Sequence, residues 1–364
     1  MKIGIACFPT YGGSGIIATE LAHLLARNHE LHLVSYDRPV RLGKKSGFSF
    51  HKVDLFSYPL FERVPCCYSL ALISKLVEVI RSYDLDIVHA HYAVPNATSA
   101  YLAKKICTDS AKLVTTLHGT DSYLVGLHPS YKEVTQFSMQ QSDALTTVSD
   151  YLKKRTMTEF DISRKITVIP NFVDSQKFRK RKKKKVQKII CHSSNFRPIK
   201  RTQDIIQAFK LISDEIDCQL FLIGDGPDRL KAEESAKDLG VLERITFFGN
   251  VKDVPEILGK SDLFLLPSED ESFGLAALEA MSCEVPVISS NVGGLKELIS
   301  PGVDGYLIKV GDVDALAKHS IKILQDPELR EKFGRNAREK VLNRYVPKKI
   351  LPKYEALYQE TLEN

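Results

Sequence analysis

Short apolar runs alternate with amphipathic stretches of about 10 to 15 residues along the whole chain. This alternation is typical of parallel sheets whose strands are joined by right-handed helical crossovers. The strands expected from the apolar runs are Ile3–Phe8, Leu31–Ser35, Phe48–Val53, Ile87–Ala90, Leu113–Leu117, Ala144–Val148, Thr167–Pro170, Lys188–His192, Gln219–Ile223, Ile245–Gly249, Leu263–Pro267, Val285–Ser289 and Gly305–Lys309.

The number of strands is too high for one open sheet, and 364 residues exceed what a single core usually serves. We therefore predict an α/β fold of two Rossmann-like, doubly wound domains that face each other across a cleft. Their expected bounds are 1–170 and 171–347. The end of the chain, 348–364, carries a helical stripe of apolar residues and is expected to pack back on the first domain.

The net charge of +6 permits anionic ligands without requiring nucleic acid. Much of this charge lies in an unbroken basic run, Arg179–Lys185, followed by Lys188. The run contains no aromatic residue for stacking on bases, so we expect no nucleic-acid partner. A solvated loop is the favoured interpretation, and weak contact of 179–188 with an anionic membrane is the alternative.

Seven cysteines form no Cys-x-x-Cys pair and are odd in number, which indicates reduced thiols. No stretch of 18 apolar residues is present, and the chain enters a strand at once, so we expect neither a transmembrane segment nor a signal peptide. The sequence therefore predicts a cytoplasmic protein and leaves its oligomeric state open, a homodimer included.

Two glutamates, Glu271 and Glu279, lie eight residues apart where an apolar strand leads into a helix. Glu271 falls in the turn and Glu279 one to two turns inside the helix, while the backbone N–H groups of Phe273 and Gly274 are free to meet a ligand. This arrangement suits a sugar nucleotide, whose ribose and hexose present hydroxyl pairs to carboxylates. The alternative is a pair of solvated glutamates at a helix end.

A basic loop, with Arg197, Lys200 and Arg201, follows the first strand of the second half. Cations at the mouth of a sheet suit a diphosphate and neutralise a leaving group that gains negative charge in the transition state. A solvated loop is again the alternative.

Glycines between the first strand and its helix, Gly12–Gly15, allow close approach of an anion to the helix start, which we expect at Ile16. The Gly-x-Gly-x-x-Gly spacing of dinucleotide sites is absent. A second pair, Gly293 and Gly294, repeats the strand-turn-helix pattern, and a tight structural turn explains it equally well.

Histidines follow two neighbouring strands of the first half. His118 comes directly after the fifth strand and is expected to line the cleft, with a neutral core histidine as the alternative. His89 and His91 end the fourth strand on the same face. Because no carboxylate cluster lies near them in the sequence, we expect no metal site and no required cofactor.

Seven motifs carry a family resemblance: Gly12–Gly15, His89–Pro95, Thr115–Asp121, Asn171–Asp174, Ser194–Arg201, Gly224–Pro227 and Glu271–Leu275. On these residues the chain resembles, over essentially its whole length, the group 4 retaining glycosyltransferases with two Rossmann-like domains, the GT-B fold. The motifs at 89–92 and 194–197 resemble more narrowly the branch that transfers N-acetylglucosamine from UDP-GlcNAc to L-malate in the first step of bacillithiol biosynthesis.

The resemblance implies a role for each site residue. Catalytic roles are implied for His118, Lys200 and Glu271. Donor-binding roles are implied for Gly13, Asn195, Arg197, Lys200, Glu271, Phe273, Gly274 and Glu279. Acceptor-binding roles are implied for Ser14, Tyr92, Thr116, Asn171 and Asn195. The implied mechanism is a front-face transfer in which the departing phosphate takes the acceptor proton, so the protein acts mainly by positioning and electrostatics.

Three positions depart from the family pattern: Gln136 stands in place of arginine, His128 in place of aspartate and Glu284 in place of glycine. Because a dicarboxylate favours cations, the first two leave other acceptors open, namely a lipid, an inositol phosphate or a polysaccharide. A binding protein that closes on a ligand without chemistry is a further alternative, which the charge-stabilising groups and the missing secretion signal argue against.

Overall fold

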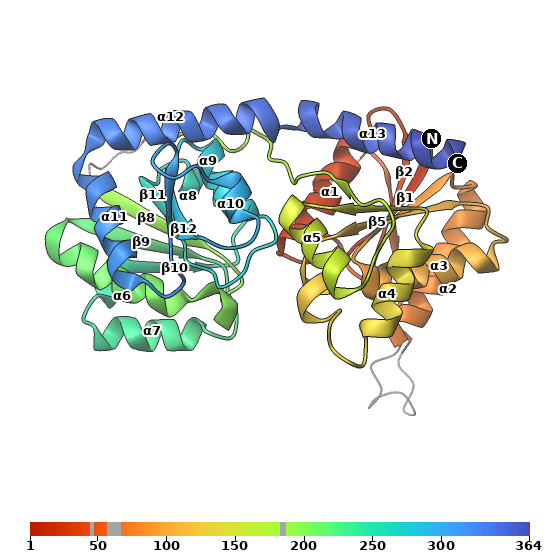
Figure 1. Ribbon diagram of the computed structural model, residues 1–364, viewed down its shortest axis with the longest axis horizontal. Coiled ribbons are helices and arrows are strands. Elements are labelled where there is room, and N and C mark those ends of the chain that lie inside the picture. The colour runs from red at the N-terminus through yellow and green to blue at the C-terminus, as the bar shows by residue number, and fades with distance from the viewer. Residues whose placement is uncertain (44–46, 57–66, 183–186) are drawn as a thin grey trace. The chain divides into compact units, whose positions relative to one another are not determined.

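The computed structural model describes residues 1–43, 47–56, 67–182 and 187–364 (Figure 1). The chain forms two compact units: unit 1 contains residues 1–170 and 350–364, and unit 2 contains residues 171–349. The domain bounds expected from the sequence are 1–170 and 171–347.

Unit 1 contains a seven-stranded parallel sheet of order β3-β2-β1-β4-β5-β6-β7. Its strands are β1 (Lys2–Ala6), β2 (Glu30–Ser35), β3 (Ser49–Lys52), β4 (Ile87–His91), β5 (Lys112–Leu117), β6 (Ala144–Thr147) and β7 (Thr167–Val168). Its helices are α1 (Gly13–Leu25), α2 (Cys67–Tyr83), α3 (Thr98–Ile106), α4 (Lys132–Gln141), α5 (Asp150–Glu159) and α13 (Pro347–Glu363), with short helical turns η2 (Ala93–Ala97) and η3 (Thr120–Leu124).

Unit 2 contains a six-stranded parallel sheet of order β10-β9-β8-β11-β12-β13. Its strands are β8 (Lys188–Ser193), β9 (Cys218–Ile223), β10 (Ile245–Gly249), β11 (Leu263–Leu266), β12 (Val287–Ser290) and β13 (Gly305–Ile308). Its helices are α6 (Thr202–Glu215), α7 (Arg229–Asp238), α8 (Val254–Leu258), α9 (Leu275–Ser282), α10 (Leu295–Leu298), α11 (Val313–Gln325) and α12 (Pro327–Arg344), with short turns η4 (Pro198–Lys200) and η5 (Leu242–Arg244).

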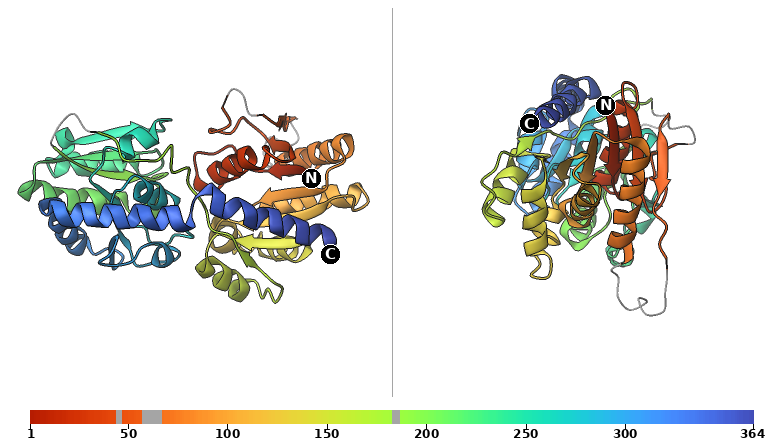
Figure 2. Two further views of the ribbon diagram at one scale, coloured as in Figure 1. Left: turned by 90° about the horizontal axis from the view of Figure 1, so that it is seen from above. Right: turned by 90° about the vertical axis from the view of Figure 1, so that its right-hand side faces the viewer.

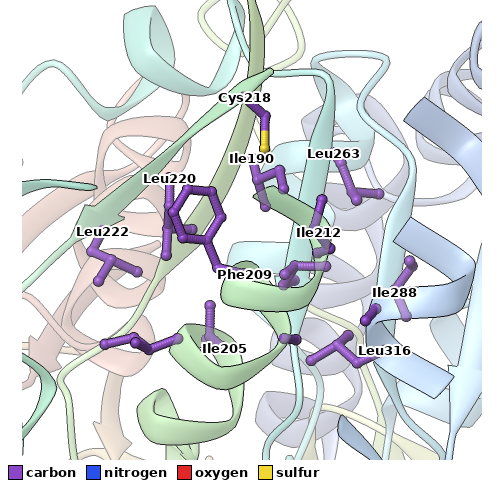
Figure 3. Close-up of a cluster of buried hydrophobic side chains, with 14 of the residues drawn as sticks. Ile190, Ile205, Phe209, Ile212, Cys218, Leu220, Leu222, Leu263, Ile288 and Leu316 are labelled. Carbon is purple, nitrogen blue, oxygen red and sulfur yellow. The ribbon is translucent and has the colours of Figure 1, made fainter. Parts of the chain in front are cut away.

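The core of unit 2 explains why its helices form where they do. Helix α6 places Ile205, Phe209 and Ile212 on one face, and these side chains pack against strand residues that include Leu220 and Leu222 (Figure 3). Full burial of such a side chain stabilises the fold by about 1.5–3 kcal/mol. The apolar face of α6 is therefore packed against the buried side chains of the sheet, and the helix forms a layer on that sheet.

Both sheets have the strand order of a Rossmann fold, which confirms the predicted fold class, and every predicted strand is present to within two residues at each end. The direction of winding reverses between β1 and β4 in unit 1 and between β8 and β11 in unit 2. Ligands of such sheets bind beyond the carboxyl ends of the strands at this switch point. The loops after these four strands contain most of the motifs singled out in the sequence.

Helix α13 belongs to unit 1 from Ile350 on, although the chain reaches it from α12 of unit 2, and in Figures 1 and 2 it lies beside the N-terminus. Ile350, Tyr354, Leu357 and Tyr358 are buried along its length. Apolar residues of the stripe expected at 348–364 are thus buried along α13, and residues 350–364 belong to unit 1.

Within the described ranges, none of the helices combines the length and the apolarity needed to span a bilayer. Five cysteines are buried free thiols, Cys7, Cys107, Cys191, Cys218 and Cys283, and Cys66 lies outside the described residues. Residues 183–186 of the basic run also lie outside them, while Lys180 and Arg181 pair with Glu284 and Glu256. Membrane contact through 179–188 and homodimer formation stay predictions.

Candidate active site

The turn between β11 and α9 carries Glu271 and depends on a glycine pair that follows β12. A Cβ on Gly293 would lie 2.0 Å from the carbonyl oxygen of Glu271, and one on Gly294 would lie 2.3 Å from that of Ser272. The Gly294 N–H donates to the Glu271 carbonyl at 2.8 Å. The second glycine pair is thus explained by close backbone packing that holds the Glu271 turn in place.

Lys200 reaches Glu271 across the switch point of unit 2. Lys200 ends η4 after β8, and its Nζ donates to Oε1 of Glu271, which also accepts from Ser268 Oγ at 3.3 Å. The side chains of Lys200 and Glu271 are only 19% and 14% exposed. A cation and a carboxylate are therefore held together at the place where a Rossmann-like sheet binds ligands.

Glu279 lies inside α9, one turn after the helix begins, as predicted, and is 5% exposed. Gly274 precedes the helix with φ of +92°, a conformation that favours glycine and lets the chain enter α9 sharply. Phe273 is buried with its ring against Tyr345, at 5.8 Å between centroids. The first carboxylate thus sits in the turn and the second within the helix.

Of the three cations expected at the basic loop, Arg201 is used within the protein. Its guanidinium binds Asp204 at 2.6 Å and Glu269 at 2.8 Å. Arg197 and Asn195 are exposed. Arg201 is thus paired with carboxylates of the protein, as Lys200 is with Glu271, and the binding of a diphosphate by this loop stays a prediction.

The motif Gly224–Pro227 packs against the backbone at the start of the basic loop, 194–201. A Cβ on Gly224 would lie 1.8 Å from the Ser194 carbonyl oxygen, and one on Gly226 would lie 2.0 Å from that of Asn195. No other residue type fits this approach without moving the backbone. The two glycines hold the start of the basic loop at the end of β8.

In unit 1, Ser14 and Tyr92 meet from the loops after β1 and β4. Their hydroxyl oxygens are 2.7 Å apart. Helix α1 begins at Gly13, three residues before the predicted start at Ile16, with Gly12 as its N-cap. A Cβ on Gly15 would lie 2.5 Å from the Phe8 carbonyl oxygen, so glycine there lets the helix start against the strand end.

His89, His91 and His118 form a buried cluster behind the Ser14–Tyr92 pair. His91 Nδ1 and His118 Nε2 are 2.8 Å apart, and the rings of His89 and His91 are 4.4 Å apart, on the same face of β4 as predicted. Burial lowers the pKa of His89 and of His118 to about 3, and lowers the pKa of His91 well below its ordinary value. All three imidazoles are neutral at physiological pH. His118 is 8% exposed and its ring lies 5.4 Å from that of Tyr92.

Two residues expected in the acceptor shell, Thr116 and Asn171, are buried, and their contact with an acceptor stays a prediction. Thr116 is fully buried, and its hydroxyl is 2.7 Å from His89 Nε2 and 2.6 Å from the Thr146 hydroxyl. It therefore supports the histidine cluster from below. Asn171 is buried at the start of unit 2, and its Oδ1 has no hydrogen-bond partner within the described residues.

Asp121 is a structural residue of the site to which the sequence motif assigned no role. Its carboxylate accepts the N–H groups of Ala93 at 3.0 Å, His118 at 3.1 Å and Gly119 at 3.0 Å. Burial raises its pKa to about 6, and these backbone hydrogen bonds oppose the rise. An aspartate three residues after a strand-end histidine is a signal for such a turn. Asp121 fastens the loop after β4 to the loop after β5.

The structure shows hydrogen bonds of two of the residues that depart from the family pattern and an unusual backbone conformation of the third. Gln136 Nε2 donates to the Phe160 carbonyl at the end of α5, at 2.8 Å, and His128 Nδ1 accepts from the Ser130 N–H at 3.2 Å. Glu284 adopts φ of +60°, the left-handed conformation in which glycine is favoured. Among the described residues, no group of three or more metal-ligating side chains is arranged to hold a metal ion.

Two family models match the chain. Residues 11–177 match "Glycosyltransferase Family 4", and residues 173–340 match "Glycosyl transferases group 1". N-acetyl-alpha-D-glucosaminyl L-malate synthase of Bacillus anthracis is 42% identical over all of this chain and 98% of its own length.

Solved structures share the fold of the whole chain. A glycosyltransferase from Rickettsia africae ESF-5 has a TM-score of 0.82 and 23% identity, with 100% of this chain and 99% of that chain covered. Anabaena HepE in complex with UDP-glucose has a TM-score of 0.81 and 19% identity, with 100% and 99% covered. At these identities the likeness establishes the fold.

Proposed function

The chain belongs to the group 4 glycosyltransferases of the GT-B fold, and on that basis we propose that it transfers N-acetylglucosamine from UDP-GlcNAc to the hydroxyl of L-malate. It is a retaining, UDP-sugar-dependent glycosyltransferase. The observation that carries the choice of substrates is the 42% identity, over the full chain, to a protein named for this transfer. We further propose that this is the first step of bacillithiol biosynthesis and takes place in the cytoplasm.

The donor is assigned to unit 2. Glu279 accepts hydrogen bonds from the two ribose hydroxyls of UDP, and Glu271 accepts hydrogen bonds from hydroxyls of the hexose. The N–H groups of Phe273 and Gly274 contribute further hydrogen bonds to the hexose. Lys200 and Arg197 bind the diphosphate. The pairing of Lys200 with Glu271 supports this division, because the cation and the carboxylate that address adjacent parts of one donor already lie side by side.

The reaction breaks the bond between the sugar's anomeric carbon and the β-phosphate oxygen and forms a bond from that carbon to the malate hydroxyl oxygen on the same face. The departing phosphate takes the hydroxyl proton, so no side chain is required as a base. Lys200 neutralises the negative charge that develops on the leaving oxygen. The protein's contribution is then orientation and charge stabilisation.

The acceptor is assigned to unit 1. The start of α1 offers N–H groups and the positive end of a 13-residue helix, and the hydrogen-bonded hydroxyls of Ser14 and Tyr92 add one further donor beside it. Malate carboxylates are suited to such donors. His118 is placed beside the donor sugar as a hydrogen-bonding group.

The test is release of UDP from UDP-GlcNAc in the presence of L-malate, D-malate, succinate or inositol phosphate. We expect L-malate to be preferred and succinate to be inert, since succinate lacks the nucleophilic hydroxyl. The same screen with UDP-glucose checks the donor hexose. A preference for inositol phosphate, or for a lipid or polysaccharide acceptor, contradicts the malate assignment and leaves the fold and the family in place.

A further inference from the structure

The position of one proton in the histidine cluster of unit 1 follows from hydrogen-bond geometry. His91 Nδ1 and His118 Nε2 face each other at 2.8 Å, so one nitrogen carries the proton and the other accepts it. Which of the two is the donor decides whether His118 offers an N–H or a bare nitrogen at its other edge.

The other ring nitrogen of His91 settles the direction. His91 Nε2 is buried and has no hydrogen-bond partner within the described residues. A proton on Nε2 would be a buried N–H without an acceptor, which is rarer in folded proteins than an unsatisfied acceptor. The proton of His91 therefore belongs on Nδ1, where it is donated to His118 Nε2.

The neighbouring histidine is held independently and does not compete for this proton. His89 Nδ1 lies 2.7 Å from the Tyr358 hydroxyl on α13, and His89 Nε2 lies 2.7 Å from the Thr116 hydroxyl. Both ring nitrogens of His89 are thus occupied. Helix α13 contacts the cluster through Tyr358 at His89. The hydrogen bond between His91 and His118 is therefore independent of the contacts of His89.

We propose that His91 is a positioning residue that keeps the proton of His118 on Nδ1, so that His118 meets a substrate as a hydrogen-bond donor. Donation suits a sugar hydroxyl, an amide carbonyl or a carboxylate oxygen, whereas a bare nitrogen would suit a base that removes the acceptor proton. The assignment of a substrate beside His118 rests on the proposed function, and the place of the proton does not.

The direct test is nitrogen-15 NMR of the full chain labelled at histidine. His192 provides an internal reference, because its Nδ1 lies 2.8 Å from the Leu265 carbonyl, which only accepts, and must therefore carry a proton. Signals of His118 are those absent from His118→Gln. We expect His118 to show the His192 pattern, with a protonated Nδ1 and a bare Nε2. A proton on Nε2 of His118 overturns the proposal.

The second test is kinetic. His91→Phe removes the donor and is expected to lower kcat by about 10- to 100-fold, by analogy with the loss of a hydrogen-bond partner that orients a metal-bound histidine. His91→Asn keeps an N–H near the position of Nδ1 and should recover most of that loss. His319→Asn, on α11 of unit 2, is the matched control. If His91→Asn folds but is as impaired as His91→Phe, the proposal is wrong.

The two tests separate this inference from the proposed function. If wild-type protein shows no transfer with any donor and acceptor, the proposed function fails while the NMR spectrum still locates the proton. If transfer occurs but the proton lies on His118 Nε2, only the positioning role of His91 fails. Should His91→Phe not fold, the spectrum of the wild-type chain alone decides.

Discussion

Lys200 donates a hydrogen bond to Glu271, and the two residues come from loops that follow adjacent strands, β8 and β11. Both side chains are more than four-fifths buried within unit 2. The hydrogen bond between them therefore holds each side chain in one orientation. Under the proposed function, the donor diphosphate draws Lys200 toward phosphate oxygens and leaves Glu271 for sugar hydroxyls. Donor binding then exchanges the contact between Lys200 and Glu271 for contacts of each residue with the donor.

We predict that Lys200→Ala lowers kcat by about 10² to 10³, by analogy with the loss of one preorganised donor, and weakens UDP binding less. Steady-state kinetics and calorimetry give the two quantities. Lys210→Ala, which removes an exposed lysine paired with Asp214 on α6, is the control. A near-normal kcat with poor binding would make Lys200 a docking residue only.

Glu279→Ala should weaken UDP binding by roughly 2–4 kcal/mol, because it removes a carboxylate proposed to accept two charge-assisted hydrogen bonds. Calorimetric titration with UDP measures this loss. The exposed Glu243, replaced by alanine, controls for the loss of one negative charge in unit 2. Unchanged UDP affinity in Glu279→Ala contradicts the ribose assignment.

Sequence patterns were sufficient for the strands, because each one is a short apolar run bounded by turn residues. They were also sufficient for the position of Glu279 inside α9 and for the apolar stripe of α13. These features depend on local periodicity. The pattern places the start of α1 three residues late, because four residues with three glycines favour a loop at Gly12–Gly15, whereas the helix begins at Gly13.

Contacts between distant residues were beyond the sequence. The bond between His89 and Tyr358 joins residues 269 positions apart, and that between Lys200 and Glu271 joins residues 71 apart. The sequence showed that Arg201 is a cation but not that Asp204 and Glu269 surround it. Such pairings follow from the packing of the sheet, which propensity does not encode.

Glu284 occupies the left-handed position that ends α9, where the Val285 N–H bonds the Ala280 carbonyl at 3.1 Å. An L-residue in this conformation costs about 1–2 kcal/mol, partly offset by the entropy that glycine loses on folding. We predict that Glu284→Gly is more stable than Glu284→Ala by about 0.5–1 kcal/mol in urea unfolding. Both variants lose the contacts with Lys180 and Arg338, so their difference reports the backbone alone. Equal stability would rule out strain at this position.

Stability should fall on acidification below about pH 6.5. The folded protein keeps His89 and His118 neutral down to about pH 3 and His192 down to about pH 4, whereas the unfolded chain protonates them near pH 6.5. The unfolded state therefore binds more protons, and each histidine contributes a loss of up to about 1.4 kcal/mol per pH unit. Asp121, with its pKa raised to about 6, acts in the opposite direction between pH 6 and pH 4.

Urea unfolding at pH 7 and pH 5 measures this loss. His89→Asn should reduce the difference between the two pH values by about 2 kcal/mol, because one neutral buried imidazole is gone. The exposed His128, replaced by asparagine, is the matched control. If His89→Asn leaves the pH dependence unchanged, His89 is not held neutral in the folded protein.

The acceptor assignment is tested by the two hydroxyls that meet at the start of α1. One hydroxyl of the pair donates to the other, so only the second can donate to a malate carboxylate. If malate binds there, Tyr92→Phe and Ser14→Ala each remove this donor or the hydroxyl that orients it, a bond worth about 1.5–3 kcal/mol, and should raise KM for L-malate by about tenfold or more. KM for UDP-GlcNAc should change little, since the donor is assigned to unit 2. Gln136→Ala is the control, because the Gln136 amide donates to the Phe160 carbonyl and is engaged at the end of α5. A rise in KM for the donor with no change for L-malate would move the acceptor away from the Ser14–Tyr92 pair.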